Sequence, residues 1–163
     1  MTTEPAGVRL ESRADFEAQV RAALLALPEG DVREARLVDV DFGDWPLGEP
    51  EVLAALTRWL QRPQRRLRLL GLQFDDVARR QPRFALWRRD WSHAIEVMRP
   101  EAVEPTDMPC LLLAGTWRLE VLDRLRWRGL VTREPGEAVL AAHRIDAISQ
   151  RCEPAWPVDT LGL

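Results

Sequence analysis

The chain has 163 residues, of which 46% are hydrophobic and 30% charged, and its net charge is −3. This composition is ordinary for one globular domain and excludes a disordered or collagen-like chain. All 23 basic residues are arginine, so Schiff-base catalysis and a P-loop are excluded, because both need a lysine side chain.

The first forty residues predict a short apolar segment, a helix and a strand. Residues 8–10 form the apolar segment, and Ser12 is placed to cap a helix that ends at Pro28. Residues 35–42 alternate apolar and acidic side chains, a pattern that is typical of a strand. Glycines and prolines then break the chain before the next helix.

The middle of the chain predicts two more strands separated by helices. Pro50 suits the first turn of a helix that runs to about residue 61. The almost continuous leucines of residues 67–72 predict a strand covered on both faces. Helical turns broken at Pro82 follow, and residues 94–98 predict the next strand. Three aromatic residues of these turns share one helical face and are interpreted as core, namely Phe84, Trp87 and Trp91.

The last third of the chain predicts a hairpin and a final helix. Residues 110–114 turn at Gly115 into a return strand, and residues 137–152 have helical periodicity. Strands that alternate with helices favour parallel pairing, whereas the hairpin adds antiparallel strands. We expect one α/β domain over residues 1–163, with a mixed sheet, helices on both faces and a flexible tail at residues 1–7.

Several segments also resemble a known fold in their order and spacing. They are residues 38–42, 44–47, 67–70, 92–97 and 144–154. Together they resemble one half of the phospholipase D-like fold, and most closely a family of uncharacterised bacterial domains, some of which are fused behind GNAT-type acetyltransferases. Active single-half members of that superfamily build their site across a two-fold axis. The resemblance, which covers roughly residues 10–163, therefore implies a homodimer.

The resemblance also implies that the chain is not an enzyme. Active members carry His-x-Lys and then an acid on the hairpin that corresponds to residues 108–115. In the simplest register Met108 replaces the nucleophilic histidine, Cys110 replaces the phosphate-binding lysine, and Gly115 lies near the acid. Without these groups the site loses its nucleophile and the neutralisation of the phosphoryl charge. We expect no catalytic residue, no cofactor, and a role in binding or assembly.

The few other reactive side chains give weak signals. His93 is a candidate general base only if an acid such as Asp90 or Glu96 orients it, and His143 falls off the apolar face of the final helix. Cys110 and Cys152 have no partner at metal-ligand spacing and are interpreted as inert, the second within the final helix.

An acidic group supports an alternative, a metal-dependent phosphotransferase or hydrolase. Asp39 and Asp41 project from one face of a strand, and Asp76 follows the next strand. Carboxylates at the C-terminal ends of neighbouring strands occupy the usual ligand-binding edge of an open α/β sheet, and oxygen ligands suit Mg²⁺. Acids after strands also cap helices and form turns, and no nucleophile accompanies these.

An arginine-rich region supports a second alternative, the binding of nucleic acid or another polyanion. Residues 1–60 hold 6 Arg and 12 acids, whereas residues 61–133 hold 15 Arg and 9 acids. The candidate anion-binding residues are Arg62, Arg65, Arg66, Arg79, Arg80 and Arg83. Use of arginine in place of lysine is also what a GC-rich genome produces.

Arginine also alternates with apolar residues after the hairpin. Arg124, Arg126 and Arg128 would share one face of a strand, where they could pair with acids of a second subunit. A homodimer or another protein partner is thus the leading expectation, ahead of nucleic acid.

The sequence gives no sign of a membrane segment. Its longest apolar runs, such as residues 111–114, are far shorter than the roughly 20 residues that span a bilayer. Residues 1–7 lack the basic and apolar regions of a secretory signal, so we expect a cytoplasmic location.

Overall fold

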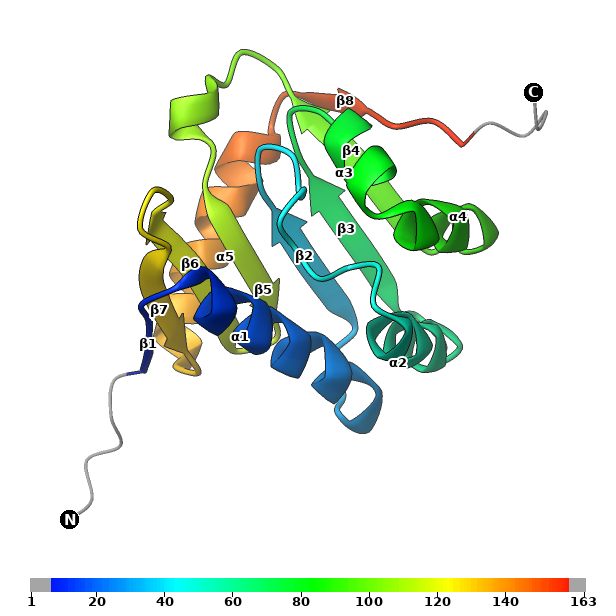
Figure 1. The fold of residues 1–163 in the computed structure, drawn as a ribbon, viewed down its shortest axis with the longest axis horizontal. Helices are drawn as coiled ribbons and strands as arrows, with labels where there is room; N and C mark the ends of the chain where they lie inside the picture. Colours follow the sequence, from blue (N-terminus) through cyan, green and yellow to red (C-terminus); the bar gives the residue numbers. More distant parts are fainter. Residues whose placement is uncertain (1–6, 159–163) are drawn as a thin grey trace.

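An eight-stranded mixed sheet runs through the structure, a computed structural model that describes residues 7–158 (Figure 1). The strands are β1 Val8–Leu10, β2 Glu34–Val38, β3 Arg66–Leu70, β4 Ile95–Pro100, β5 Cys110–Ala114, β6 Trp117–Asp123, β7 Arg128–Thr132 and β8 Cys152–Pro154. Their order is β1-β7-β6-β5-β2-β3-β4-β8. Strands β2, β3 and β4 are parallel, and the other neighbours are antiparallel.

Helices cover both faces of this sheet. They are α1 Arg13–Ala26, α2 Pro50–Leu60, α3 Asp75–Arg80, α4 Pro82–Asp90 and α5 Pro135–Ser149, with short 3₁₀ turns at Leu27–Glu29 and Pro105–Asp107. Helices α1 to α4 lie on one face and α5 lies on the other (Figure 1). The predicted mixed α/β sheet with helices on both faces is therefore confirmed. No helix within residues 7–158 is long and apolar enough to cross a membrane.

Local chemistry explains where these helices begin. The Ser12 hydroxyl accepts a hydrogen bond from the Asp15 amide at 3.1 Å, which caps α1. Pro50 occupies the first turn of α2, where its missing amide hydrogen costs nothing. The tail predicted for residues 1–7 lies almost wholly outside the described residues.

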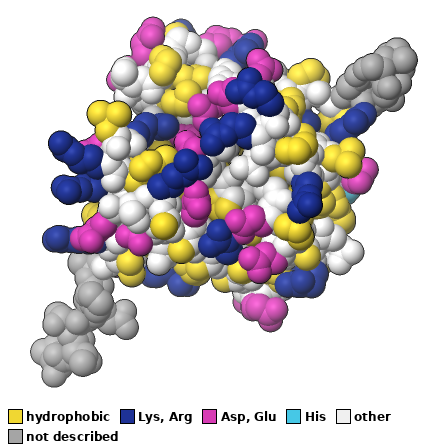
Figure 2. Space-filling model, in the orientation of Figure 1, with side chains coloured by type: hydrophobic (Ala, Val, Ile, Leu, Met, Phe, Trp, Pro, Cys, Tyr) yellow, Lys and Arg dark blue, Asp and Glu magenta, His cyan; other side chains and the backbone are white. Residues whose placement is uncertain are grey.

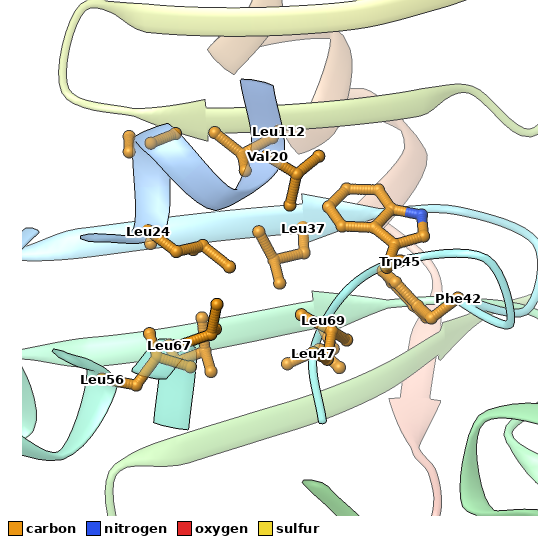
Figure 3. Packing of buried hydrophobic residues seen from close by; sticks show 14 of the residues in the cluster. Val20, Leu24, Leu37, Phe42, Trp45, Leu47, Leu56, Leu67, Leu69 and Leu112 are labelled. Carbon is orange, nitrogen blue, oxygen red and sulfur yellow. The ribbon is translucent and has the colours of Figure 1, made fainter. Parts of the chain in front are cut away.

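The core has two parts because the sheet is buried on both faces. The larger part packs α1, α2 and α4 against the sheet, and the loop after β2 inserts Phe42, Trp45 and Leu47 into it (Figure 3). The smaller part lies under α5, where Ile145 packs among residues that include Val38 of β2. A fully buried leucine side chain in either part contributes about 1.5–3 kcal/mol to stability through the hydrophobic effect. The predicted aromatic stripe is confirmed as core, since Phe84 is buried and Trp87 and Trp91 pack against the larger cluster.

Several predicted boundaries are wrong. Strand β2 ends at Val38 rather than Phe42, because the Asp39 carboxylate accepts the Phe42 amide hydrogen at 3.0 Å and closes a turn. Residues 124–127, considered above as part of a strand, form a turn, since Asp123 accepts the amide hydrogens of Leu125 and Arg126 and Trp127 has a φ of 55°. Cys152 lies in β8 rather than in the final helix, which ends at Ser149.

Candidate functional site

Asp39 lies at the C-terminal edge of the parallel strands, directly after β2. Its Oδ2 accepts hydrogen bonds from the Phe42 amide at 3.0 Å and from the Trp45 indole at 3.1 Å. Its Oδ1 lies 2.7 Å from the Arg124 guanidinium, in an ion pair without hydrogen-bond alignment. Only 4% of Asp39 is exposed. Both oxygens of the Asp39 carboxylate are therefore engaged: Oδ2 holds the loop after β2, and Oδ1 contacts Arg124 in the turn after β6.

The other two acids of the predicted metal site are also engaged locally. Asp41 accepts the Gly43 amide hydrogen at 2.9 Å. Asp76 pairs with Arg79 at 2.7 Å and accepts from the Gln73 amide at the same distance. Across residues 7–158, no three His, Cys, Asp or Glu side chains form a group that could hold a metal ion. The structure does not bring Asp39, Asp41 and Asp76 together as one metal-binding set.

A hollow of about 570 Å³ opens beside the start of β5, on the hairpin that corresponds to the catalytic one by resemblance. Met108 and Cys110 line it, and both are buried. Burial, followed by the nearby Asp39 carboxylate, raises the pKa of the Cys110 thiol well above its usual value. The thiol therefore stays protonated near neutral pH, and a protonated thiol is a poor nucleophile.

The same hollow contains a buried carboxylate that the sequence analysis missed. Glu120 of β6 is 3% exposed and lies between two arginines. Arg118 donates to its Oε1 at 2.6 Å, and Arg144 of α5 donates to its Oε2. The sequence of β6 alternates Trp117, Leu119 and Val121 with Arg118 and Glu120, a pattern that by itself predicts a wetter face for the two charged residues. That face is closed by α5, an arrangement that no local pattern reveals.

The six candidate anion-binding arginines lie at two opposite edges of the sheet. Arg62, Arg65 and Arg66 lie before or at the start of β3, whereas Arg79 and Arg80 follow its end in α3 and Arg83 lies in α4. A five-residue strand is about 17 Å long, so the two groups do not form one surface.

Two of the three arginines at the C-terminal edge have acidic partners. Arg79 pairs with Asp76, and Arg80 pairs with Asp44 at 2.9 Å. Arg83 is exposed on α4. Figure 2 shows positive and negative side chains interleaved over the face that carries α1 to α4. These charges largely neutralise one another.

The arginines at the N-terminal edge are more crowded. Arg62 donates to the carbonyl oxygens of Pro28 and Gly30, and Arg65 donates to the carbonyl oxygen of Pro63 at 2.9 Å. The Nε atom of Arg65 is enclosed and has no hydrogen-bond partner among the described residues. Desolvation, and then the positive charges of Arg62 and Arg33, lower the pKa of Arg65. Arg33 was absent from the predicted set because it lies far from the others in the sequence.

The histidines lie outside both groups. His93 is exposed and its ring lies against Trp91, with 5.7 Å between centroids. Glu96, one of the acids considered as its partner, pairs with Arg68 at 3.0 Å instead. His143 is exposed on α5. Arg124, for which acids of a second subunit were considered as partners, pairs with Asp39 of its own chain.

Comparisons with known proteins identify the fold. No protein-family model matches the sequence, and no curated protein matches it. Among solved structures, the archaeal chromatin protein TrmBL2, described as showing a novel mode of DNA binding, has a TM-score of 0.65 at 10% identity over 95% of this chain. The match covers 56% of the TrmBL2 chain, so this chain spans little more than half of that protein.

A second solved structure carries the resemblance that the sequence analysis described. Nuc from Salmonella typhimurium, a phospholipase D family member, has a TM-score of 0.54 at 7% identity, over 84% of this chain and 91% of that one. Identities this low show the fold and no more. The chain therefore has a phospholipase D-like α/β fold.

Proposed function

We propose that this chain is a non-catalytic phospholipase D-like binding module. The observation that carries the proposal is the chemistry at the hairpin, where Met108 and Cys110 stand at the positions that resemblance assigns to the nucleophile and the phosphate-binding lysine. A thioether and a protonated thiol supply neither function. Shifting the register does not restore the lysine, since the chain has none.

The charged groups beside this hairpin support the same proposal. Arg124 donates to the Met108 carbonyl oxygen at 3.3 Å and pairs with Asp39. Arg144 is held by Glu120. Both arginines are thus anchored to buried carboxylates, which reduces the positive charge available for stabilising a phosphoryl transition state.

A hydrolysis assay tests the absence of catalysis. We expect bis-p-nitrophenyl phosphate to be hydrolysed no faster with the protein than in buffer, with or without Mg²⁺ or Mn²⁺. Asp39→Asn is the matched variant, because a metal-dependent site built on Asp39 would lose activity in it. Metal-dependent turnover that disappears in Asp39→Asn would overturn the proposal in favour of the hydrolase alternative.

A protein partner, with a second copy of this chain as the first choice, is part of the proposal. It is supported by the resemblance to single-half members and by the apolar residues that β6, β7 and α5 leave exposed, namely Leu122, Leu130 and Leu140. The resemblance of the sequence to bacterial domains fused behind GNAT-type acetyltransferases adds such an enzyme as a second partner to test, and the cytoplasm is the proposed location. Light scattering after size exclusion should give twice the monomer mass, and a monomer at all micromolar concentrations would contradict the homodimer.

Nucleic-acid binding is the second candidate function. The similarity to TrmBL2, an archaeal protein described as binding DNA, favours it together with the crowded arginines before β3. Anisotropy of a fluorescent mixed-sequence oligonucleotide should rise at low salt and fall as salt is added. Charge reversal at Arg65 and Arg66 should abolish the rise, and no binding at low salt would remove this candidate.

A further inference from the structure

We infer that Arg33, Arg62 and Arg65 form a binding site for a phosphate group at the N-terminal edge of β2 and β3. This inference rests on the proposed binding function, which it deepens by naming a ligand chemistry and a place. The three residues are called the arginine triad below.

The fold brings the triad together from three segments. Arg33 precedes β2, Arg62 follows α2, and Arg65 precedes β3. Strands β2 and β3 are parallel neighbours, and the Arg66 amide donates to the Arg33 carbonyl oxygen at 2.9 Å. The loops that enter the two strands therefore run side by side.

Contacts with carbonyl oxygens hold two of the three guanidinium groups. Arg62 is fixed by Pro28 and Gly30 at the end of the first helical segment, and Arg65 by Pro63. These bonds satisfy donors without adding negative charge. The enclosed Nε of Arg65 still lacks an acceptor among residues 7–158. A donor without an acceptor is unfavourable, so a small movement of this partly exposed side chain that brings an oxyanion to Nε would be favoured.

The charge around the triad is not balanced by the protein. Among the described residues, Asp31 reaches Arg62 at 3.6 Å, and its side chain is fully exposed. The next arginines along β3 differ, since Arg68 pairs with Glu34 at 2.9 Å and with Glu96 at 3.0 Å. Within residues 7–158 the three arginines thus have one acidic ion-pair partner, the exposed Asp31, which leaves a local excess of positive charge suited to an anion.

Phosphate matches this arrangement better than other common anions. A guanidinium presents forked N–H donors, and a phosphate offers several oxygens that accept from more than one fork. Stabilisation of the C-terminal end of α2 by nearby cations would account for Arg62. It would not account for Arg33 or for the unsatisfied Nε of Arg65.

Side-chain NMR tests the inference with inorganic phosphate as the probe. Arginine Nε–Hε signals are followed while phosphate is added to the whole chain, and chloride at equal ionic strength is the reference. We expect the Arg65 signal to shift saturably with phosphate and not with chloride. Arg33→Gln should weaken this response about three- to tenfold, and Arg79→Gln, at the opposite edge, should not change it.

A second arm distinguishes free phosphate from the phosphates of a nucleic acid. A labelled oligonucleotide that binds the wild type, is displaced from Arg65 by phosphate, and binds Arg65→Gln several-fold more weakly identifies the backbone as the ligand. Phosphate shifts without oligonucleotide binding identify free phosphate. Melting temperatures of the variants confirm that they are folded.

The inference and the proposed function fail differently. If phosphate and chloride shift Arg65 equally, or if Arg65→Gln binds the oligonucleotide as well as the wild type, the triad is not the site, while the non-catalytic module stands. If the chain hydrolyses the phosphodiester substrate, the proposed function fails, and the NMR result is unaffected.

Discussion

The two edges of the parallel strands have opposite character. The C-terminal edge collects acids, including Asp39 and Asp76, and each is matched by an arginine or an amide within about 3 Å. The N-terminal edge collects Arg33, Arg62 and Arg65, with the exposed Asp31 as their acidic ion-pair partner among the described residues. Open α/β sheets usually bind ligands at the C-terminal edge. Here that edge is closed by its own ion pairs, so an anionic ligand is better sought at the other one.

The largest effect on stability should come from removing the Asp39 carboxylate at the C-terminal edge of the parallel strands. We expect Asp39→Ala to lower the free energy of unfolding by about 2–4 kcal/mol, because it leaves the Phe42 amide and the Trp45 indole without their acceptor and Arg124 without its buried counter-ion. Urea denaturation measures the loss. Asp41→Ala is the control, since Asp41 accepts one hydrogen bond and is less buried, and its loss should stay below about 1 kcal/mol. Equal losses would show that the closed edge does not depend on Asp39.

The second prediction concerns the buried carboxylate beneath α5. We expect Glu120→Gln to cost about 2 kcal/mol, because Arg118 and Arg144 lose a shared buried counter-ion while both keep some contact with water. Glu137→Gln is the matched control, as Glu137 reaches Arg118 at 3.4 Å from a partly exposed position and should cost little. Thermal and urea melts of the two variants should separate clearly, and overlapping curves would contradict the prediction.

The sequence predicted most of the architecture. Helical and period-two patterns, with proline and glycine at the breaks, predicted the helices, strands β2 to β6 and the mixture of parallel and antiparallel pairing, but not β7 or β8. The sequence patterns failed to predict turns that are closed by side-chain hydrogen bonds. Asp39 and Asp123 each end a regular segment by accepting amide hydrogens, and the local pattern around them still alternates like a strand.

The candidate sites were harder to predict, because they depend on which strands are neighbours. Spacing in the chain placed Arg62 and Arg80 in one basic region, but strand β3 separates them. Arg33 joins Arg62 only through the parallel pairing of β2 with β3. The burial of Glu120 depends in the same way on α5, which lies on the face that alternation alone assigns to solvent.

The third prediction uses acid to probe an ion pair between α1 and the start of α2. Arg21 donates two hydrogen bonds to Glu49, at 2.6 and 2.8 Å, and this contact lowers the pKa of Glu49 below its ordinary 4.5. Since the folded state holds the charged form, the contribution is complete above pH 4.5 and is lost as the pH falls through the lowered value. It is about 1 kcal/mol or less, because both side chains are about one-third exposed. Wild type and Glu49→Gln should differ in stability at pH 6 and converge near pH 3. A constant difference across that range would assign the effect of the substitution to something other than charge.

The smallest effect should come from the N-terminal edge of the parallel strands, and its sign is opposite to that of the three effects above. We expect Arg65→Gln to raise the melting temperature slightly at low salt, because it removes a positive charge from beside Arg62 and Arg33 and a donor that has no acceptor in the described chain. Added salt screens the repulsion and should shrink the difference. Phosphate should stabilise the wild type more than an equal ionic strength of chloride and should stabilise Arg65→Gln no more than chloride does. Arg79→Gln, which breaks an ion pair at the closed edge, should lose stability instead. If Arg65→Gln is less stable than the wild type in chloride, Arg65 belongs to the structural framework, and the two edges differ less than their charges suggest.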